Sequence, residues 1–346
     1  MTSDASLVVL NVGHGLCAVL TDDTGTVLFD VAPGPVPRDY LRSRGIDRID
    51  AVMLSHLHKD HCAGVTGFLG GDYLLAELFM NRPRAAETKT YEDIKAMINE
   101  SRKRRDGCPK VRQFDTDAEY PVLERGEVTV NIVAPDAVEA RSHRTATGSR
   151  HTDHSSSGVV RIDCRDRPRV LIAGDLDRRG LEQIIQRDAS ALRADVLVYP
   201  HHGGSSEDTD EEGFAQLLAS HVRPELVIFS MGRQTGERPH PEVLAGMNST
   251  MQPKVVCTQL SPLCDDREPG HVGRLDPLPM AHSVEPERRQ LSCGGSIMIP
   301  LSSSGATFVG EADHKSFLDR EDGVPDPLCR RHATPGFTSP GSSACS

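Results

Sequence analysis

The sequence predicts a layered fold of α-helices and β-strands, and two observations lead to this prediction. Short apolar runs rich in β-branched residues recur along the chain, and several end in Gly, Asp or His, as strands that deliver loops do. Between the later runs, apolar residues recur at three- and four-residue spacing, which is the helical period. Strands first, then strands alternating with helices, indicate a layered α/β protein rather than a sandwich of sheets alone.

The predicted elements follow from these patterns in chain order. Strands are predicted over residues 7–12, 17–20, 26–31, 51–54, 128–133, 159–162, 170–173, 196–199, 226–229, 254–257 and 296–299. Helices are predicted over residues 91–105, 177–193 and 211–220. The first helix ends in the basic run Arg102-Lys103-Arg104-Arg105, which is either a solvated face or a basic lip over a phosphate-bearing substrate. Residues beyond 301 are rich in Ser, Gly, Pro and charge, so we expect one domain over residues 1–305 and a disordered tail over 306–346.

Composition limits the classes of function. The chain of 346 residues has 39 Lys and Arg against 50 Asp and Glu, a net charge of −11, which disfavours broad, salt-driven attachment to nucleic acid. No apolar run approaches the roughly 18 residues of a membrane helix, and the first residues lack the order of a signal peptide. Nine cysteines at irregular spacings indicate reduced thiols. We therefore expect a soluble, cytoplasmic protein without a membrane partner.

A segment rich in histidine follows the predicted strand at residues 51–54. It reads Ser55-His56-Leu57-His58-Lys59-Asp60-His61, the pattern HxHxDH. In an extended segment His56 and His58 point the same way, so both can bind one ion. Asp60 and His61 follow as the chain turns, which lets them face a second ion. The pattern therefore predicts a metal site on a loop that leaves a strand.

With these residues the chain resembles the metallo-β-lactamase-fold hydrolases. Among them it is most similar to stand-alone relatives of the β-lactamase-like domain of the DNA-uptake protein ComEC. The resemblance extends over residues 7–299 and is carried, in order, by Leu10-Asn11-Val12-Gly13-His14-Gly15, Phe29-Asp30, HxHxDH, Ala173-Gly174-Asp175-Leu176, Pro200-His201-His202-Gly203-Gly204 and Pro239-His240-Pro241-Glu242-Val243. It implies a four-layer αββα metallo-β-lactamase sandwich.

The resemblance also implies a set of metal ligands. His56 and His58 would hold the first ion, Asp60 and His61 the second, and Asp175 would bridge both, since its two oxygens can each serve one cation. The third histidine of the first ion would come from the loop before the strand at 159–162. That loop offers His151 and His154, of which we favour His154.

Two loops compete for the last ligand of the second ion. Counting strands after Asp175 favours His240, and His201 and His202 would then contact a substrate oxyanion. One departure from the family pattern is Asn11, where relatives usually have Asp. Asn11 can hydrogen-bond a histidine but cannot share a negative charge, so it could orient a ligand less strongly.

These expectations lead to a hydrolase with two divalent ions, for which we expect zinc, with manganese or iron as alternatives. Such a pair of ions lowers the pKa of a bridging water, so that hydroxide exists at neutral pH. We expect Asp60, His201 and His202 to be catalytic, and we predict a phosphodiesterase acting on single-stranded nucleic acid or a small phosphodiester. Hydrolysis of a lactone, thioester or β-lactam is the second enzymatic hypothesis. A metal-containing binding module without turnover is a third hypothesis.

A separate cysteine pattern lies near the end of the predicted domain. Cys257, Cys264 and Cys293, with His271 or His282 between, could form a structural zinc site. Their loose spacing equally fits buried cysteines without a metal.

Overall fold

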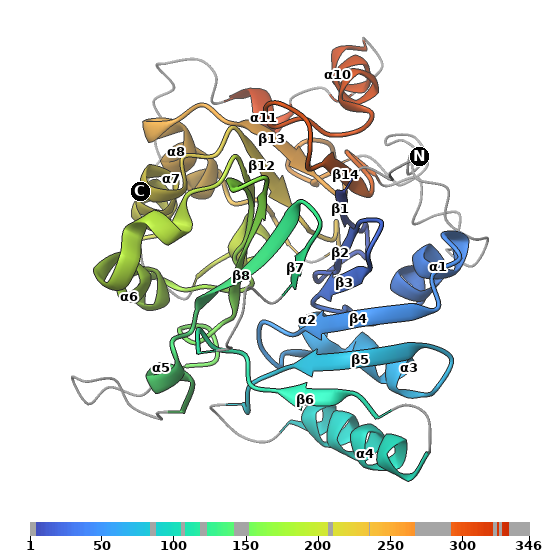
Figure 1. Cartoon of the computed structure of the whole chain (residues 1–346). Helices are drawn as coiled ribbons and strands as arrows, with labels where there is room; N and C mark the ends of the chain where they lie inside the picture. Colours follow the sequence, from blue (N-terminus) through green and yellow to red (C-terminus); the bar gives the residue numbers. More distant parts are fainter. Residues whose placement is uncertain are drawn as a thin grey trace, which may run out of the picture.

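The described part of the computed structural model forms four layers, with two β-sheets stacked face to face and helices on both outer faces (Figure 1). It comprises residues 5–83, 88–104, 108–117, 123–141, 152–206, 210–234, 236–266, 292–320, 324 and 327–331. The predicted αββα fold class is confirmed.

The first sheet has seven strands in the order β14-β1-β2-β3-β4-β5-β6. Strands β14 to β3 pair antiparallel, whereas β3 to β6 pair parallel. The strands span β1 (Ser6–Val9), β2 (Ala18–Thr21), β3 (Thr26–Phe29), β4 (Arg48–Met53), β5 (Leu74–Phe79), β6 (Lys110–Arg112) and β14 (Ile297–Pro300). Helices of the first half of the chain cover its outer face: α1 (Val36–Ser43), α2 (Lys59–Cys62), η1 (Ala63–Val65), α3 (Thr66–Leu69) and α4 (Lys89–Lys103).

The second sheet repeats this plan with the order β13-β12-β11-β10-β9-β8-β7. Here β10 to β13 pair parallel and β7 to β10 pair antiparallel. The strands span β7 (Leu123–Arg125), β8 (Val128–Ala134), β9 (Val159–Cys164), β10 (Arg167–Ile172), β11 (Val196–Val198), β12 (Leu226–Phe229) and β13 (Lys254–Cys257). The remaining helical segments of this half are α5 (Ala137–Arg141), α6 (Arg178–Asp188), η2 (Ala189–Leu192), η3 (Pro200–Gly203), α7 (Glu211–Val222) and α8 (Pro241–Thr250).

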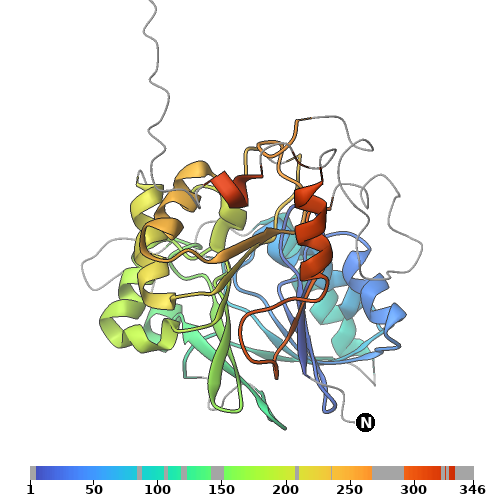
Figure 2. The same cartoon turned by 90° about the horizontal axis from the view of Figure 1, so that it is seen from above.

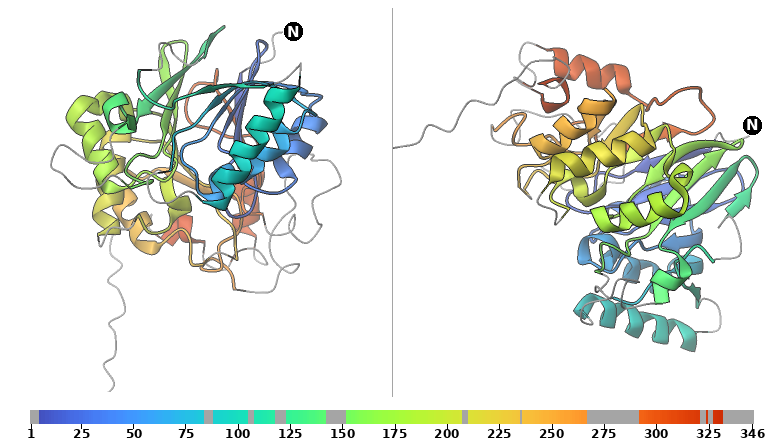
Figure 3. Two further views of the ribbon diagram at one scale, coloured as in Figure 1. Left: turned by 90° about the horizontal axis from the view of Figure 1, so that it is seen from below. Right: turned by 90° about the vertical axis from the view of Figure 1, so that its left-hand side faces the viewer.

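The main core lies between the two sheets, where small aliphatic side chains interdigitate. Val9 and Phe29 of the first sheet meet Val130 and Ile172 of the second, and all four are buried. Figure 2 shows the two sheets side by side with helices outside both. A second core packs α6, α7 and α8 on the second sheet, and a third packs α1 and α4 on the first (Figure 3). Apolar faces on both sides of each sheet explain why the strands appear as continuous apolar runs.

The chain continues to pack beyond the expected domain boundary at residue 305. Phe308 is buried in the core between the sheets, and α10 (Glu311–Asp319) and α11 (Leu328–Arg331) follow. Leu318 and Leu328 from these helices are buried against the outer core of the second sheet. The disordered tail expected from residue 306 is therefore wrong for this part, because isolated apolar residues in a polar segment suffice to dock short helices. Residues 332–346 lie outside the described part.

Strands β5, β6 and β7 and helix α1 were not predicted. Charged or exposed residues interrupt the apolar pattern in β5 and β6, so neither gives a clear two-residue period. Within the described ranges, no helix is long and apolar enough to cross a membrane.

Candidate metal centre

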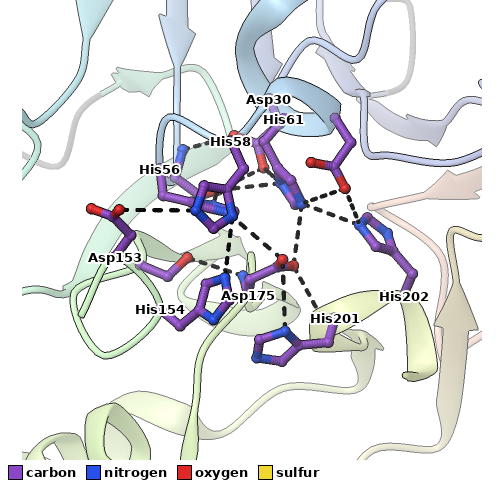
Figure 4. A network of polar contacts seen from close by, with 12 residues as sticks. Asp30, His56, His58, His61, Asp153, His154, Asp175, His201 and His202 are labelled. Atoms are coloured by element: carbon purple, nitrogen blue, oxygen red, sulfur yellow. Dashed lines mark hydrogen bonds and ion pairs between the residues drawn. The ribbon is translucent and has the colours of Figure 1, made fainter. Parts of the chain in front are cut away.

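The candidate site lies where loops from both sheets meet. His56 and His58 follow β4, Asp60 and His61 lie on α2, and His154 precedes β9. On the second sheet, Asp175 follows β10, and His201 and His202 lie on η3 directly after β11. Because β10 and β11 are parallel neighbours, the loops at their carboxyl ends emerge side by side. Figure 4 shows the Asp175 carboxylate in the middle of these histidines.

One group of possible ligands comprises His56, His58, His154 and Asp175, whose ligand atoms all lie within 4.8 Å of one another. His58 Nδ1 lies 3.2 Å from His154 Nε2, and His56 Nε2 lies 3.7 Å from Asp175 Oδ2. The Nε2 atom of His56 is buried and has no hydrogen-bond partner among the described residues. Three imidazoles and a carboxylate thus converge with one nitrogen unpaired.

A second group lies on the other side of Asp175 and comprises His61, Asp175 and His202. His61 Nε2 lies 3.2 Å from Asp175 Oδ1 and 3.2 Å from His202 Nε2. Asp60 adjoins this group, because its Oδ2 lies 3.3 Å from His202 Nε2 and 3.1 Å from His14 Nε2. Asp175 therefore belongs to both groups.

Hydrogen bonds behind three of the rings fix where their protons lie. Ser55 Oγ donates its only proton to Asp30 at 2.8 Å, so it accepts from His56 Nδ1 at 3.1 Å. Asp30 Oδ2 accepts from His61 Nδ1 at 2.7 Å. The carbonyl oxygen of Ser230 accepts from His202 Nδ1 at 2.8 Å. Each ring in its neutral form then carries a lone pair on Nε2, directed into the site.

This arrangement fits divalent cations. The Nε2 atoms of His61 and His202 face each other over 3.2 Å, so a proton or a metal cation must lie between or beside their lone pairs, and a bound cation would replace that proton. The buried, unpartnered Nε2 of His56 has the same need. Imidazole and carboxylate are the ligands that zinc, manganese and iron accept.

The charges of the site favour a cation between the carboxylates. Burial lowers the pKa of His56 well below its usual value, which keeps that ring neutral. Burial also lowers the pKa of His61, but the carboxylates of Asp175 and Asp30 outweigh it and hold the pKa well above the usual value. Burial alone would raise the pKa of Asp175, but the neighbouring His61 outweighs this effect and holds the pKa well below its usual value, so this carboxylate stays ionised. The position beside Asp175 thus attracts positive charge.

The backbone is specialised at the two loops from the second sheet. Gly174 has φ +54°, and a Cβ there would lie 2.6 Å from Ser157 Oγ and 2.8 Å from Ser55 Cβ. Only glycine fits this position, which lets Asp175 approach the histidine loop. His201 and His202 also have left-handed backbones, with φ of 52° and 56°. Such conformations cost about 1–3 kcal/mol each and cluster at functional sites.

The structure does not bring every expected residue to the site. The His240 ring forms a hydrogen bond with Glu211 Oε2 at 3.0 Å and belongs to none of the described ligand groups. The backbone N–H of His240 donates to the Gly203 carbonyl. His240 thus lies behind the loop that carries His202. His201 contacts Asp175 through its backbone N–H at 3.1 Å, and its buried Nε2 has no hydrogen-bond partner among the described residues. Burial lowers the pKa of His201 to about 4. His151 lies outside the described residues.

Asn11 differs from its expected role as well. Its side chain donates to Ser292 Oγ at 3.0 Å and accepts from Gln259 Nε2 at 2.9 Å, instead of bonding a histidine. The amide joins the start of the first sheet to the segment before β14.

Several residues of the site were not assigned a role from the sequence. Asp30, Ser230 and His14 hold or contact the ligand groups, as the distances above show. Arg238 approaches the same place, with Nη1 3.2 Å from His14 Nδ1. Asp30 and His14 lie in the motifs that carry the resemblance, so their positions were visible although their contacts were not.

The cysteines of the predicted zinc site lie close together but form no metal-ligand group among the described residues. Cys257, Cys264 and Cys293 line one small cavity together with Cys329 of α11. Within the described ranges, no group of three ligand atoms that lie within 4.8 Å of one another includes a cysteine. His271 and His282 lie outside the described part.

Sequence comparisons find relatives of this chain. Residues 10–71 match the family model of the metallo-beta-lactamase superfamily. The chain is 26% identical over 206 residues to ComE operon protein 3 of Bacillus subtilis (strain 168), covering 59% of this chain and 23% of that protein. It is 22% identical over 236 residues to competence protein ComA of Neisseria gonorrhoeae, covering 66% of this chain and 27% of that protein. The chain thus aligns with about a quarter of the length of these curated relatives.

Among solved structures, the metallo-beta-lactamase fold protein YhfI from Bacillus subtilis is similar with a TM-score of 0.44 and 14% identity, covering 73% of this chain and 96% of that one. The family match includes the HxHxDH loop. The chain therefore matches the metallo-beta-lactamase superfamily over residues 10–71 and is similar to ComE operon protein 3 and to competence protein ComA, as the ComEC-type resemblance implied.

Proposed function

We propose that this protein is a phosphodiesterase that works with two divalent cations, zinc by preference, held on either side of Asp175. His56, His58 and His154 would hold one cation, and Asp60, His61 and His202 the other. The observation that carries this proposal is the shared position of Asp175 in both ligand groups. Cations bound there would supply a nucleophilic water of lowered pKa and would stabilise the negative charge that develops on the phosphoryl oxygens.

The residues around the ligands would keep them in the binding form. Asp30, Ser55 and Ser230 hold the Nδ1 protons of three ligand rings, which prevents those rings from turning their lone pairs away. His201 lies beside Asp175 with an unpaired ring nitrogen. If that nitrogen carries the proton of the neutral ring, it can donate a hydrogen bond to a phosphoryl oxygen or to the leaving group.

An anionic substrate suits the edge of the site better than a neutral one. Two dications against the carboxylates of Asp60 and Asp175 leave a positive surplus, and the guanidinium of Arg238 adds a charge next to His14. A phosphodiester carries the matching negative charge, whereas lactones and most thioesters lack one at the reacting group.

Hydrolysis assays with two probes test the substrate class. We expect turnover of bis(4-nitrophenyl) phosphate that is abolished by a chelator and restored by zinc or manganese, and little turnover of a neutral lactone. Arg238→Met should weaken turnover of the diester and leave any lactone turnover unchanged. Faster lactone hydrolysis with no diester hydrolysis would favour carbonyl chemistry, and metal binding without either activity would favour a binding module.

A matched pair of histidine variants tests the ligand assignment. His202→Ala should lower metal content and turnover together, because its Nε2 faces His61 and Asp60. His240→Ala should keep both metals, because its ring bonds Glu211 instead. Metal loss in His240→Ala together with full metal content in His202→Ala would reverse the assignment.

A further inference from the structure

A groove lined by cationic side chains lies beside the first sheet, outside the metal centre. It encloses about 670 Å³ between α4, α5 and the ends of β5 and β6. Arg82, Lys95, Arg102, Arg112 and Arg141 line it, and none of the described residues of its wall is acidic. In a chain with a net charge of −11, such a concentration of positive charge marks a place where an anion would bind.

Two of these cations have no acidic partner among the described residues. Lys95 pairs with Glu92 at 2.7 Å, Arg112 with Glu77 at 3.0 Å and Arg141 with Asp117 at 3.6 Å. By contrast, Arg82 and Arg102 make no ion pair with any residue in the described part of the chain. Arg102 donates one hydrogen bond, to Asn99 Oδ1 at 3.3 Å, and both arginines are exposed. No described acidic residue therefore competes with a ligand for these two guanidinium groups.

The wall of the groove is linked to the histidine loop through a short series of packing contacts inside the protein. Asn81, in the groove wall, binds the backbone of Phe114 through two hydrogen bonds of 2.6 and 3.1 Å. The ring of Phe114 packs on Gly158, where a Cβ would come within 2.5 Å of it. The N–H of Gly158 donates to the carbonyl of Ser55 at 2.8 Å, one residue before His56. Parallel strands β4, β5 and β6 also end at one edge of the sheet, so the groove and the histidine loop share that edge.

We propose that this groove binds the phosphate backbone of a single-stranded nucleic acid whose scissile diester lies at the metal centre. The inference rests on the proposed phosphodiesterase function and names its substrate class. A small phosphodiester has one negative charge, which the metal centre itself receives. Arginines outside that centre would add affinity for a substrate that carries further phosphates, which their planar groups can bind through paired hydrogen bonds.

The test measures binding rather than cleavage. The probe is a fluorescein-labelled single-stranded DNA of about 20 nucleotides with phosphorothioate linkages, which keep the charge and resist hydrolysis. Its affinity for the metal-loaded protein is measured by fluorescence anisotropy over a series of salt concentrations. Arg82→Ala/Arg102→Ala should weaken binding about 25-fold at 0.1 M salt and reduce the slope of log affinity against log salt by about 1.4, because each lost phosphate contact contributes about 0.7.

The control is Arg44→Ala/Lys103→Ala, which removes the same charge outside the groove. Lys103 lies on the same helix as Arg102 and pairs with Glu100 at 2.6 Å, and neither control residue lines the groove. We expect nearly unchanged DNA binding in the control, and unchanged hydrolysis of bis(4-nitrophenyl) phosphate in both double variants. Unchanged hydrolysis also shows that the variants are folded.

Equal losses of DNA binding in both double variants, or none in either, would overturn the inference. Hydrolysis of the small diester without DNA binding would overturn it as well and leave the proposed function intact. DNA binding that depends on Arg82 and Arg102, without hydrolysis of any diester, would support the groove as a binding site and reject the phosphodiesterase.

Discussion

Replacing Asp30 with Asn should weaken metal binding at the His61 side of the centre by about 10–100-fold. Asp30 is 1% exposed and accepts three hydrogen bonds, from Ser55 N at 2.7 Å, Ser55 Oγ at 2.8 Å and His61 Nδ1 at 2.7 Å. Asn keeps the size of the side chain but exchanges one accepting oxygen for an NH2 donor. In place of Oδ2 that donor would face the protons of Ser55 Oγ and His61 Nδ1, and in place of Oδ1 it would face the Ser55 N–H. In either orientation His61 loses the negative charge that holds its Nδ1 proton.

The expected loss of affinity corresponds to about 1.4–2.7 kcal/mol of binding free energy. The same substitution leaves a buried donor without an acceptor, which costs about 1–3 kcal/mol of folding stability. A control must therefore separate the two effects. Asp50→Asn serves as this control, because Asp50 is also buried on β4 and accepts from Thr26 N at 2.9 Å, but it lies in the first half of the strand, whereas His56 follows its last residue.

The assay is a competition titration of zinc between the metal-free protein and a chelating dye, at a temperature at which circular dichroism shows each variant to be folded. We expect weaker zinc binding in Asp30→Asn and wild-type binding in Asp50→Asn. Wild-type affinity in Asp30→Asn, or equal losses in the two variants, would refute the role given to the Asp30 carboxylate.

Three further predictions concern the fold and the loop that carries Asp175. Gly174→Ala should lose metal binding, because its Cβ would displace Ser157. The control Gly45→Ala should retain metal, because Gly45 also has a positive φ (+67°) but a Cβ there would meet nothing within 4 Å. Equal metal content in the two variants would argue against crowding at Gly174. A chain that ends at residue 305 should be less stable by roughly 5–9 kcal/mol in urea unfolding than one that ends at Arg331, because it loses buried Phe308, Leu318 and Leu328. Equal stability would mean that these helices contribute nothing. Arg169→Met should lower the free energy of unfolding by about 3–5 kcal/mol in the same assay. Arg169 is buried, pairs with Asp195 and donates to the carbonyls of Leu301 and Gly305. A change under about 1 kcal/mol would show that the pair is dispensable.

Much of the fold could be predicted because its strands are buried on both faces and are therefore apolar throughout. The predicted run at 226–229 matches β12 at both ends, and the helix predicted at 211–220 lies within α7. Two of the four edge strands, β6 and β7, gave no such signal. β6, at the edge of the first sheet, carries Lys110 and Arg112, and only its position beside β5 makes it a strand. The docked helices after residue 310 escaped prediction for a similar reason, since each buries only a few side chains.

The site was predictable where its residues are neighbours in the sequence. The HxHxDH loop places four candidate ligands within six residues, so local geometry alone brings them near each other. The choice between His202 and His240 depends instead on which strands are adjacent. Counting strands favoured His240, but β11 lies directly beside β10, and so the structure places His202 next to Asp175. The role of Asp30 was not predictable either, because it requires knowing that β3 and β4 are parallel neighbours.

The metal content of wild-type protein and of an Asp175→Asn variant tests the central claim most directly. Asp177→Asn is the matched control, since Asp177 lies two residues further on and caps α6 by accepting from Gly180 N at 2.8 Å. After loading with zinc and removal of free metal, elemental analysis should find about two ions per chain in the wild type and in Asp177→Asn. It should find well under one in Asp175→Asn, because two cations without the shared carboxylate repel each other. Wild-type metal content in Asp175→Asn, or a wild type that binds no zinc, would contradict a centre built around Asp175.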